Sequence, residues 1–549
     1  MICVSQNGVI ARRGIPVGLL VAIAGAASGQ LETRDWLLSE SGFWSDASRW
    51  SDADVPDSPS EIVRLSPAPQ RSGTEQGDIP TVSVDGAYEV YRVVGDGGVR
   101  VRIDPGSTLN TLTGLYGEDD GTLAVDIGST DLDGGAALNV TGARAFTRSA
   151  LIRLADLGEA SSLGFDSYTV LDEATTIEGA GMITGEISNH GRIASKRFAP
   201  TGVVELTIDS ADIVNWNEIR AGSGAYLVFD QSAIDQRTDG RITSISRVTF
   251  RDSSLLGGTI DRSGRGSFTI EGQSSFEDVH IDNVVLNVDG ELALLGNEFR
   301  NDGFVYVDDE TGVLTIDDEI AFVGEGRMSF GGSAAPASLA HYSPGGKIRN
   351  GVGHTITGWG DIGVPLTNDG ILEVSGNFNT AGFIEIQGAF EQEPTGLLEL
   401  VIDEDMSDLI ADRIIINRNT AHLAGTLRVR LYGNIERFVG KPIPAVRILQ
   451  NSPSQTINGE FDTIELFRNS AGQNLSPILG VEYLPDRVNL TLYCIADVNR
   501  DGVVSPSDFS AWVSAYNEQS SLADANLDGV VNTFDFNAWV STFNSGCGR

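Results

Sequence analysis

Basic side chains are scarce in this sequence, and lysine is nearly absent. Lys196, Lys347 and Lys441 are its only lysines, and 37 Lys and Arg residues stand against 76 Asp and Glu residues in a chain of 549. The formal net charge of −39 excludes nucleic acid and anionic membrane surfaces as natural partners, because both would be repelled. Cations are the favoured partners of such a chain.

Long hydrophobic runs are missing except near the first residue. Arg12 and Arg13 precede an apolar stretch at 15–27, and small residues follow it. This pattern predicts a signal peptide over residues 1–29, used by the general secretory or the twin-arginine route. The stretch is too short to span a bilayer as a helix, and an uncleaved anchor is the alternative. We therefore expect a secreted or cell-surface protein that does not span a membrane after signal cleavage.

Cysteine is rare as well. Cys3 falls in the expected signal peptide, which leaves Cys494 and Cys547 on either side of a repeated C-terminal segment. We expect these two residues to form a disulfide outside the cytoplasm, and two free thiols are the alternative. A zinc site is not expected, because the five histidines are scattered and none lies near either cysteine.

Helical periodicity is lacking between residues 36 and 493. Segments such as VLTID at 313–317 and AHLAGTLRVRL at 421–431 place apolar residues at every second position, which is the period of a strand with one buried face. The 65 glycines suit many tight turns between short strands. The sequence therefore predicts a mainly β body.

Two distant segments of this body repeat each other. TIEGAGMITGEISNHGRI begins at Thr176, TITGWGDIGVPLTNDGIL begins at Thr355, and NDGFV at 301–305 repeats their core. Asn and Gly tolerate left-handed backbone angles, so we interpret Asn-x-Gly as a tight corner that turns the chain into the next strand. Such recurring corners predict a right-handed parallel β-helix or a similar solenoid. Because the spacing is irregular, a β-sandwich array is the alternative.

Both ends of the β body resemble a known group of proteins. SGFWSDASRWSDADVPDSPSEIVRL at 41–65 is similar to the GxWxDxxNWxxxxxP opening of large secreted bacterial proteins with autotransporter-passenger-like repeats, common in planctomycetes, and residues 376–492 resemble their closing module. The resemblance implies a parallel β-helix or a similar stack. We divide the chain into a signal peptide at 1–29, an N-terminal β region at 30–110, solenoid repeats at 111–375, a C-terminal β module at 376–493 and a final module at 494–549.

The final module contains a loop and helix that occur twice. ADVNRDGVVSPSDFSAWVSAYN at 496–517 is followed by ADANLDGVVNTFDFNAWVSTFN at 523–544. Their polar residues have the spacing of a calcium loop, in which side chains at positions 1, 3 and 5 turn inward and an acidic residue at position 12 closes the shell. The sequence predicts two Ca2+ ions, held by Asp497, Asn499, Asp501, the Val503 carbonyl, Ser505 and Asp508, and by Asp524, Asn526, Asp528, the Val530 carbonyl, Asn532 and Asp535.

A helix is expected after each loop. Ser505 suits an N-cap and Pro506 the first helical position, and apolar residues follow at helical spacing. We expect the two helices to pack antiparallel, with a shared core of Phe509, Trp512, Val513, Tyr516, Phe536, Trp539, Val540 and Phe543.

Half of an EF-hand used twice, with aspartate at position 12, resembles the type I dockerin domain over residues 494–549. The resemblance implies calcium-dependent folding and attachment to a cohesin module on another protein. Family members contact cohesin through loop positions 10 and 11, which are Pro506 and Ser507 in one copy and Thr533 and Phe534 in the other. Neither helix contains the Lys or Arg that the family uses there, so the expected partner is a cohesin-like or another surface protein.

Two functions fit these observations. The first is a non-catalytic secreted or surface β-solenoid that attaches to another protein through its calcium-dependent module. The second is an enzyme that acts on polysaccharide, because parallel β-helices host such enzymes. We assign no catalytic residue, and we interpret the acidic clusters at 117–121, 308–310 and 317–319 as solvated corners or incidental calcium sites. Aligned carboxylates with an arginine in one groove would favour the enzyme, whereas polar ladders would favour the non-catalytic protein.

Overall fold

The computed structural model describes residues 31–546 with internal gaps. The gaps are residues 38–39, 67–78, 96–98, 118–121, 129–134, 143–144, 156–160, 199–202, 237–238, 309–310, 317, 332–336, 341–344, 376–381, 405–408, 418, 433–438, 440–442, 450–454, 469–472 and 476–477. The expected signal peptide, Cys547 and most of the three acidic clusters therefore lie outside the described residues.

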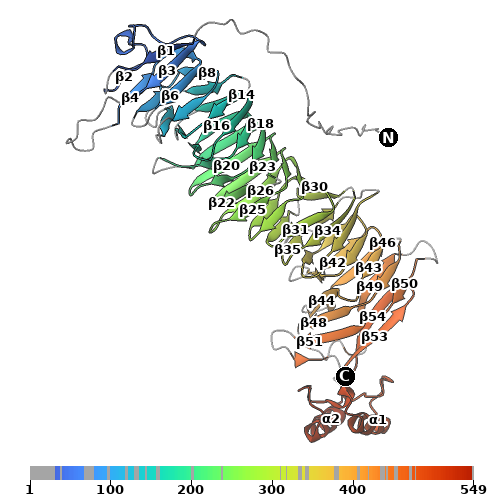
Figure 1. The fold of residues 1–549 in the computed structure, drawn as a ribbon. Coiled ribbons are helices and arrows are strands. Elements are labelled where there is room, and N and C mark those ends of the chain that lie inside the picture. Colours follow the sequence, from blue (N-terminus) through green and yellow to red (C-terminus); the bar gives the residue numbers. More distant parts are fainter. Residues whose placement is uncertain are drawn as a thin grey trace.

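The body is a long stack of short coils, with the two helices beyond its far end (Figure 1). One long sheet takes a strand from almost every coil, and all its pairings are parallel. In stacking order its strands are β2 (Gly42–Phe43), β4 (Thr81–Val84), β7 (Arg100–Ile103), β10 (Leu123–Ile127), β13 (Ala150–Leu154), β15 (Thr176–Gly179), β17 (Arg192–Ser195), β19 (Glu218–Ala221), β22 (Arg241–Ser244), β25 (Thr259–Arg262), β28 (His280–Asp282), β31 (Glu298–Asn301), β34 (Glu319–Val323), β37 (Lys347–Asn350), β40 (Leu366–Asn368), β43 (Phe390–Gln392), β47 (Ala421–Leu423) and β50 (Ile457–Gly459).

The remaining sides of the stack form a second long sheet. Its strands are β5 (Ala87–Val90), β8 (Thr108–Thr111), β11 (Ala137–Val140), β12 (Phe146–Thr147), β14 (Ser162–Leu171), β16 (Gly181–Asn189), β18 (Val204–Asn215), β20 (Ala225–Asp230), β21 (Ala233–Asp235), β23 (Arg247–Arg251), β24 (Ser254–Leu256), β26 (Ser267–Glu271), β27 (Gln273–Glu277), β29 (Val285–Val288), β30 (Glu291–Leu295), β32 (Phe304–Val307), β33 (Val313–Ile316), β35 (Arg327–Phe330), β36 (Ala337–Ala340), β38 (Thr355–Gly358), β39 (Gly360–Ile362), β41 (Ile371–Val374), β42 (Phe383–Ile386), β44 (Leu397–Glu404), β45 (Leu409–Ala411), β46 (Arg413–Asn417), β48 (Thr426–Leu431), β49 (Ile443–Leu449), β51 (Thr463–Arg468), β52 (Gln473–Asn474), β53 (Leu479–Leu484) and β54 (Arg487–Leu492). These pairings are parallel except toward the C-terminal end. There β45 pairs antiparallel with β44, β52 with β51, and β54 with both β49 and β53.

The core follows from the alternation in the sequence. In β20 and β23 every second residue points inward, and Phe229 and Phe250, which are paired in register, stack with ring centroids 5.1 Å apart. Each coil covers the apolar face of its neighbours in this way. The predicted mainly β, parallel stacked body is confirmed. The β-sandwich alternative is wrong, because such arrays are built from antiparallel sheets whereas successive coils here pair in parallel.

A small sheet and a tryptophan cluster occupy the N-terminal end. The sheet contains β1 (Glu32–Asp35), β3 (Glu61–Leu65), β6 (Arg92–Gly95) and β9 (Leu115–Gly117), with a 3-10 turn at Ala47–Arg49. Trp44 donates its Nε1–H to the Pro56 carbonyl at 2.9 Å, and Trp50 donates to the Trp44 carbonyl at 2.8 Å. The Trp and Pro residues at 41–65 therefore build the end of the stack.

Buried asparagines line a corner of the stack. Asn189 donates its amide to Asn215 in the next coil at 2.8 Å, and Asn215 donates to Gln236 in the coil after that at 3.2 Å. A second ladder joins Asn350 to Asn368 and Asn368 to Gln392. All of these side chains are buried, and each amide satisfies its neighbour's hydrogen-bonding group away from water.

The physical reason expected for the Asn-x-Gly corners is wrong, although the corners exist. None of Asn189, Asn368 or the glycines two residues after them has a positive φ. The asparagine is selected by the ladder, and the glycine by close approach of another coil. A Cβ on Gly370 would lie 2.3 Å from the Gly351 carbonyl oxygen, far inside contact distance.

Two helices complete the described chain, α1 (Pro506–Asn517) and α2 (Thr533–Ser545), with a 3-10 turn at Ser521–Ala523 between them. Ser505 is the N-cap of α1 and Pro506 its first residue, as predicted. Asn532 caps α2 in the same manner. Both caps are capping boxes in which an aspartate at the third helical position accepts from the backbone of the cap residue.

His354 is fully buried beside the second asparagine ladder. The side-chain NH2 of Asn350 donates to Asn368, which fixes the orientation of the Asn350 amide. Its Oδ1 therefore faces His354 and accepts the hydrogen bond from Nδ1–H at 2.7 Å. Asn301 Oδ1 accepts the backbone N–H of Gly303, so the side-chain NH2 of Asn301 is the group that faces His354. It donates to His354 Nε2 at 3.1 Å. The neighbours thus select one neutral tautomer. Burial lowers the pKa of His354 to about 4, although the charge of Asp302 acts in the opposite direction.

This histidine predicts acid sensitivity of the solenoid. The unfolded chain takes up the proton near pH 6.5 and the folded chain only near pH 4, so stability falls as the pH drops through that interval. The loss attributable to His354 reaches about 3 kcal/mol at the lower pH. His354→Gln should flatten this part of a urea-unfolding pH series. His422→Gln, at an exposed histidine, is the control, and an equally steep profile for both variants would refute the assignment.

Candidate functional site

The aspartate at position 1 organises each C-terminal loop. Asp497 accepts the Asp501 amide at 3.1 Å and the Gly502 amide at 3.0 Å, one on each carboxylate oxygen. Asp524 accepts the amides of Asp528 and Gly529 at 3.1 and 2.9 Å in the second loop. Each carboxylate oxygen still has a lone pair for another partner. The glycines at position 6 have φ values of 81° and 83°, which a side chain would disfavour.

The aspartate at position 12 closes each loop. Asp508 accepts the backbone N–H of Asn499 at 3.1 Å and the backbone N–H of Ser505 at 2.8 Å. One carboxylate therefore connects loop positions 3 and 9 with the start of the helix. Asp535 accepts the equivalent amides of Asn526 and Asn532 at 3.1 and 2.7 Å. Both carboxylates are fully buried. The two loops therefore have the same internal geometry.

The other predicted ligands line the rims of the loops. In the first loop, Asn499 Oδ1 accepts the backbone N–H of Asp501, and Asp501 Oδ1 accepts that of Val503. The second loop has the same two hydrogen bonds, at Asn526, Asp528 and Val530. The Val503 and Val530 side chains are exposed, as expected where only the carbonyl is used. Ser505 Oγ lies 2.6 Å from Ser507 Oγ in the first loop. In the second loop the side-chain amide of Asn532 donates to the Val530 carbonyl at 3.0 Å.

Negative charge gathers in these loops without a basic counterpart. Burial raises the pKa of Asp497, and the nearby charges of Asp508 and Asp501 add to the effect against opposing backbone hydrogen bonds. Burial also raises the pKa of Asp524, with added repulsion from Asp535 and Asp528. In the described part of the chain, none of the four buried aspartates at positions 1 and 12 forms an ion pair with Lys, Arg or His.

The donor chemistry of the loops suits a hard divalent cation. Carboxylate, amide, hydroxyl and backbone carbonyl oxygens are the ligands that Ca2+ takes. Among the described residues no group of three or more His, Cys, Asp or Glu side chains is gathered as a metal cluster. The predicted ligand set therefore depends on Asn499, Ser505, Asn526, Asn532 and the two valine carbonyls in addition to the carboxylates.

The four residues of the predicted docking face are all exposed. Pro506 and Ser507 lie at the start of α1, and Thr533 and Phe534 at the start of α2, where Phe534 is 70% exposed. The expected helix core is partly wrong. Trp512 and Trp539 are buried, but Phe509, Val513 and Phe536 remain 44%, 37% and 39% exposed. Aromatic rings of α1 and α2 contact one another between the helices.

The sequence did not indicate that this module packs on the solenoid. Position 4 of each loop carries the contact: Leu527 packs against the main core, and the Arg500 guanidinium lies 5.1 Å from the centre of the Tyr493 ring. Ile495 contacts both the main core and the small core between the helices. Cys494 is disulfide-bonded, and its predicted partner Cys547 lies outside the described residues. Sequence pattern alone could not assign these contacts, because position 4 supplies no ligand to the loop and therefore has no role in the motif.

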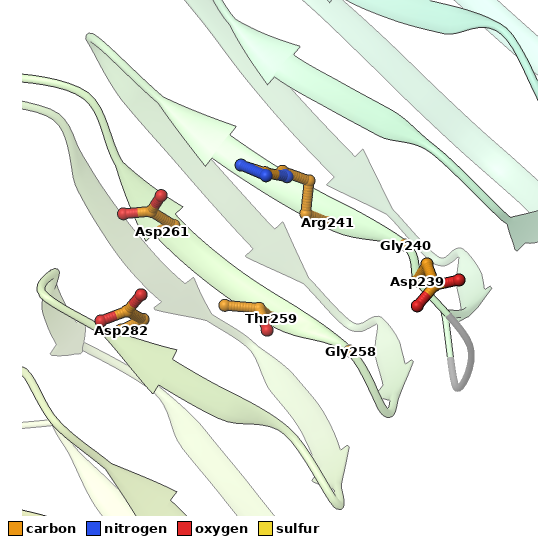
Figure 2. Close-up of a pocket in the computed structure, with 7 residues that line it drawn as sticks. All are labelled: Asp239, Gly240, Arg241, Gly258, Thr259, Asp261 and Asp282. Carbon is orange, nitrogen blue, oxygen red and sulfur yellow. The ribbon is translucent and has the colours of Figure 1, made fainter.

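A polar pocket of about 320 Å3 lies on the long parallel sheet, at strands β22, β25 and β28 (Figure 2). Its lining is Asp239, Gly240, Arg241, Gly258, Thr259, Asp261 and Asp282. Figure 2 shows the Arg241 side chain extending along the sheet in the direction of Asp261. Sequence analysis missed this pocket, because its residues come from three coils and form no linear motif.

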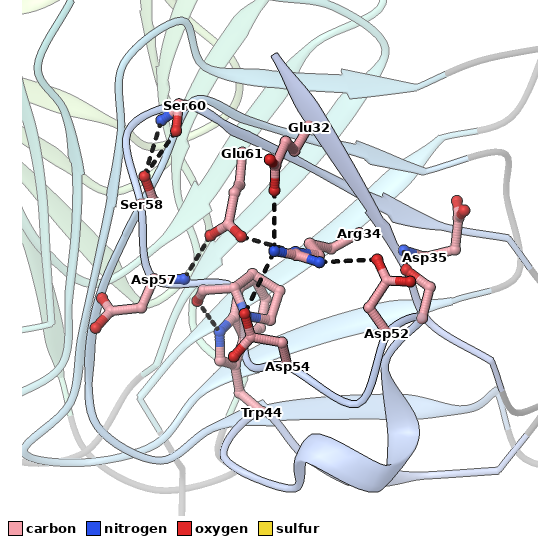
Figure 3. A network of polar contacts seen from close by, with 12 residues as sticks. Glu32, Arg34, Asp35, Trp44, Asp52, Asp54, Asp57, Ser58, Ser60 and Glu61 are labelled. Atoms are coloured by element: carbon pink, nitrogen blue, oxygen red, sulfur yellow. Dashed lines mark hydrogen bonds and ion pairs between the residues drawn. The ribbon is translucent and has the colours of Figure 1, made fainter. Parts of the chain in front are cut away.

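Most other charged side chains on the same sheet pair along the stack. Arg100, Asp126, Arg153, Glu178 and Lys196 form an unbroken series of ion pairs at 2.9–3.8 Å across successive coils. At the N-terminal end Arg34 is surrounded by four carboxylates (Figure 3), those of Glu32, Asp52, Asp54 and Glu61. The series from Arg100 to Lys196 is a polar ladder along the stack, whereas the Arg34 cluster belongs to the small N-terminal sheet.

Comparison with known proteins gives no family assignment. No protein-family model matches the chain, and no curated protein matches it. Within the described ranges, no helix is long and apolar enough to cross a membrane.

The contact between the module and the solenoid can be tested with matched variants. Leu527→Asp places a charge against the core, so we expect faster amide hydrogen exchange in residues 478–500 and in the loops. Val352→Asp changes a valine that is 71% exposed at a turn of the solenoid, outside the C-terminal loops, and should leave the exchange as in the wild type. Equal exchange in the two variants would contradict the packing of Leu527 on the solenoid.

Proposed function

We propose that this protein is a non-catalytic secreted or cell-surface β-solenoid that attaches to another protein through a calcium-folded, dockerin-like module at residues 494–549. The observation that carries the proposal is the duplicated loop, in which two buried aspartates and their backbone hydrogen bonds recur at the same positions. A chain has little physical reason to bury four carboxylates without a basic partner unless a cation is to be bound.

Calcium would be held by residues of each loop in turn. Asp497, Asn499, Asp501, Ser505, Asp508 and the Val503 carbonyl would serve the first ion, and Asp524, Asn526, Asp528, Asn532, Asp535 and the Val530 carbonyl the second. The ion supplies positive charge at the point where position 1 and position 12 approach each other. Because position 12 is also the third residue of the helix, holding it fixes the start of α1 or α2.

The attachment surface is proposed at the helix starts. Pro506, Ser507, Thr533 and Phe534 are exposed there, and the adjoining Phe509 and Phe536 extend the apolar area. Neither helix contains Lys or Arg, so the partner need not be acidic at this point. A cohesin-like or another surface protein with an apolar pocket for Phe534 fits this chemistry.

The ladders on the body support a non-catalytic role. They pair acids with bases along most of the described sheet, which leaves the charges there engaged in the stack. The resemblance of the repeats to secreted proteins and the disulfide at Cys494 support an extracellular location. Right-handed winding is proposed from the general handedness of parallel crossovers. The polar pocket is the one described feature that favours the alternative, an enzyme acting on polysaccharide.

Calcium binding predicts two ions per chain and a gain of helical structure. Isothermal titration of the chelated full-length protein should show two sites with Kd from roughly micromolar to sub-millimolar. The apparent melting temperature and far-ultraviolet helical signal of the module should fall when chelator is added. The double variant Asp508→Asn and Asp535→Asn should lose both sites.

The matched control is Glu518→Gln, which removes one exposed carboxylate just after α1 and should titrate as the wild type. Circular dichroism and melting that do not change between calcium and chelator, together with no measurable heat of binding, would overturn the proposal. Retention of both sites in the double variant would overturn the ligand assignment.

A further inference from the structure

One corner of the solenoid carries a row of five equivalent residues. The first residues of β17, β19, β22, β25 and β28 pair in register along the long sheet. Two residues before them, in the same order, stand His190, Trp216, Asp239, Gly257 and Asp278. The row therefore begins with two aromatic side chains, continues with a carboxylate and a position with no side chain, and ends with a second carboxylate.

The aromatic part of the row is an exposed platform. His190 and Trp216 lie in successive coils with ring centroids 5.4 Å apart and an interplanar angle of 9°. Trp216 is 43% exposed, although tryptophan is usually well buried. Asn217 fixes this corner, because its amide donates to the His190 carbonyl at 3.0 Å and its own carbonyl accepts the Arg241 amide at 2.9 Å. The platform is thereby joined directly to the first strand of the pocket.

Two glycines form the corner at the pocket. Gly257 and Gly258 have φ values of 70° and 71°, which side chains disfavour. A Cβ on Gly258 would lie 2.5 Å from Cγ of the buried Gln236, so close packing of the neighbouring coil requires glycine there. The pocket of about 320 Å3 that Gly258 lines is at the lower end of the range of ligand sites, about 300–1,000 Å3.

The polar groups of the pocket are not used by the stack. Asp261 and Asp282 are paired in register on β25 and β28, so two like charges stand side by side. Within the described residues neither carboxylate forms an ion pair, unlike the acids of the ladder from Arg100 to Lys196. Arg241 and Thr259 are paired in register on β22 and β25, and Thr259 precedes Asp261 by two residues on the same outward face of the sheet. These groups are available as hydrogen-bond acceptors and donors for a ligand.

We propose that the polar pocket at Asp261 and Asp282, together with the neighbouring platform of His190 and Trp216, binds a neutral polysaccharide chain. We call this combined surface the groove. A sugar ring has an apolar face that packs on an indole and hydroxyl groups that donate to carboxylates and accept from arginine. Three aspartates with one arginine, on a chain of net charge −39, would repel an acidic polysaccharide. This inference goes beyond attachment through the C-terminal module and does not depend on it.

The test uses the full-length protein on an array of neutral oligosaccharides (glucans, mannans, xylans, chitin fragments) and acidic ones (polygalacturonate, alginate), with the Kd of each hit measured in solution. We expect binding to neutral chains alone. Trp216→Ala should weaken it by about tenfold, and Asp261→Asn with Asp282→Asn should also weaken it. Tyr168→Ala is the matched control, because Tyr168 is also 43% exposed but lies on β14, and it should bind as the wild type.

Three results would overturn the proposal: no neutral oligosaccharide bound, equal binding by Trp216→Ala and the wild type, or calcium rather than sugar titrating at Asp261 and Asp282. Trp216→Phe retains a ring and should keep most of the affinity, which separates lost stacking from a disturbed fold. Repeating the array with chelator distinguishes the two proposals, since binding in the groove should persist when the C-terminal loops are stripped of metal.

Discussion

The parallel backbone ladder between successive coils is the constraint on which this molecule depends. Every coil must present its strands in register with the next, and every corner must bring the chain back within reach. The buried asparagine ladders meet that requirement by bonding coil to coil at one corner. The same constraint leaves two open ends of the stack. The tryptophan cluster lies at the N-terminal end, and the β53–β54 hairpin and the C-terminal module lie at the other.

The sequence predicted those features that are local or periodic. Alternation of apolar residues indicated strands, and the loop spacing indicated the caps at Ser505 and Asn532. It misjudged Asn189 and Asn368, because a residue that suits a left-handed turn is also suited to a buried amide ladder, and one sequence does not distinguish the two. It could not indicate the pocket or the contact of Leu527, since both join residues from separate coils or modules.

The large excess of acidic residues is distributed unevenly once the chain is folded. Along much of the long sheet arginines alternate with carboxylates, and the few lysines join them, as Lys196 joins Glu178. Carboxylates without such partners include those of the C-terminal loops and the pair Asp261 and Asp282 in the groove. In the loops the aspartates at positions 1 and 12 are buried, which favours a bound cation. In the groove the carboxylates are partly exposed near Arg241, which favours hydroxyl groups.

The geometry of the loops also links the C-terminal module to the solenoid. Arg500 and Leu527 occupy position 4 of the two loops and both have a φ of 59°, so the conformation that closes each loop also directs this residue toward the end of the stack. The buried aspartates maintain that conformation through the amides on either side of position 4. Anything that opens a loop therefore removes a contact from the end of the solenoid, so the proposed cation would stabilise the module and the stack together.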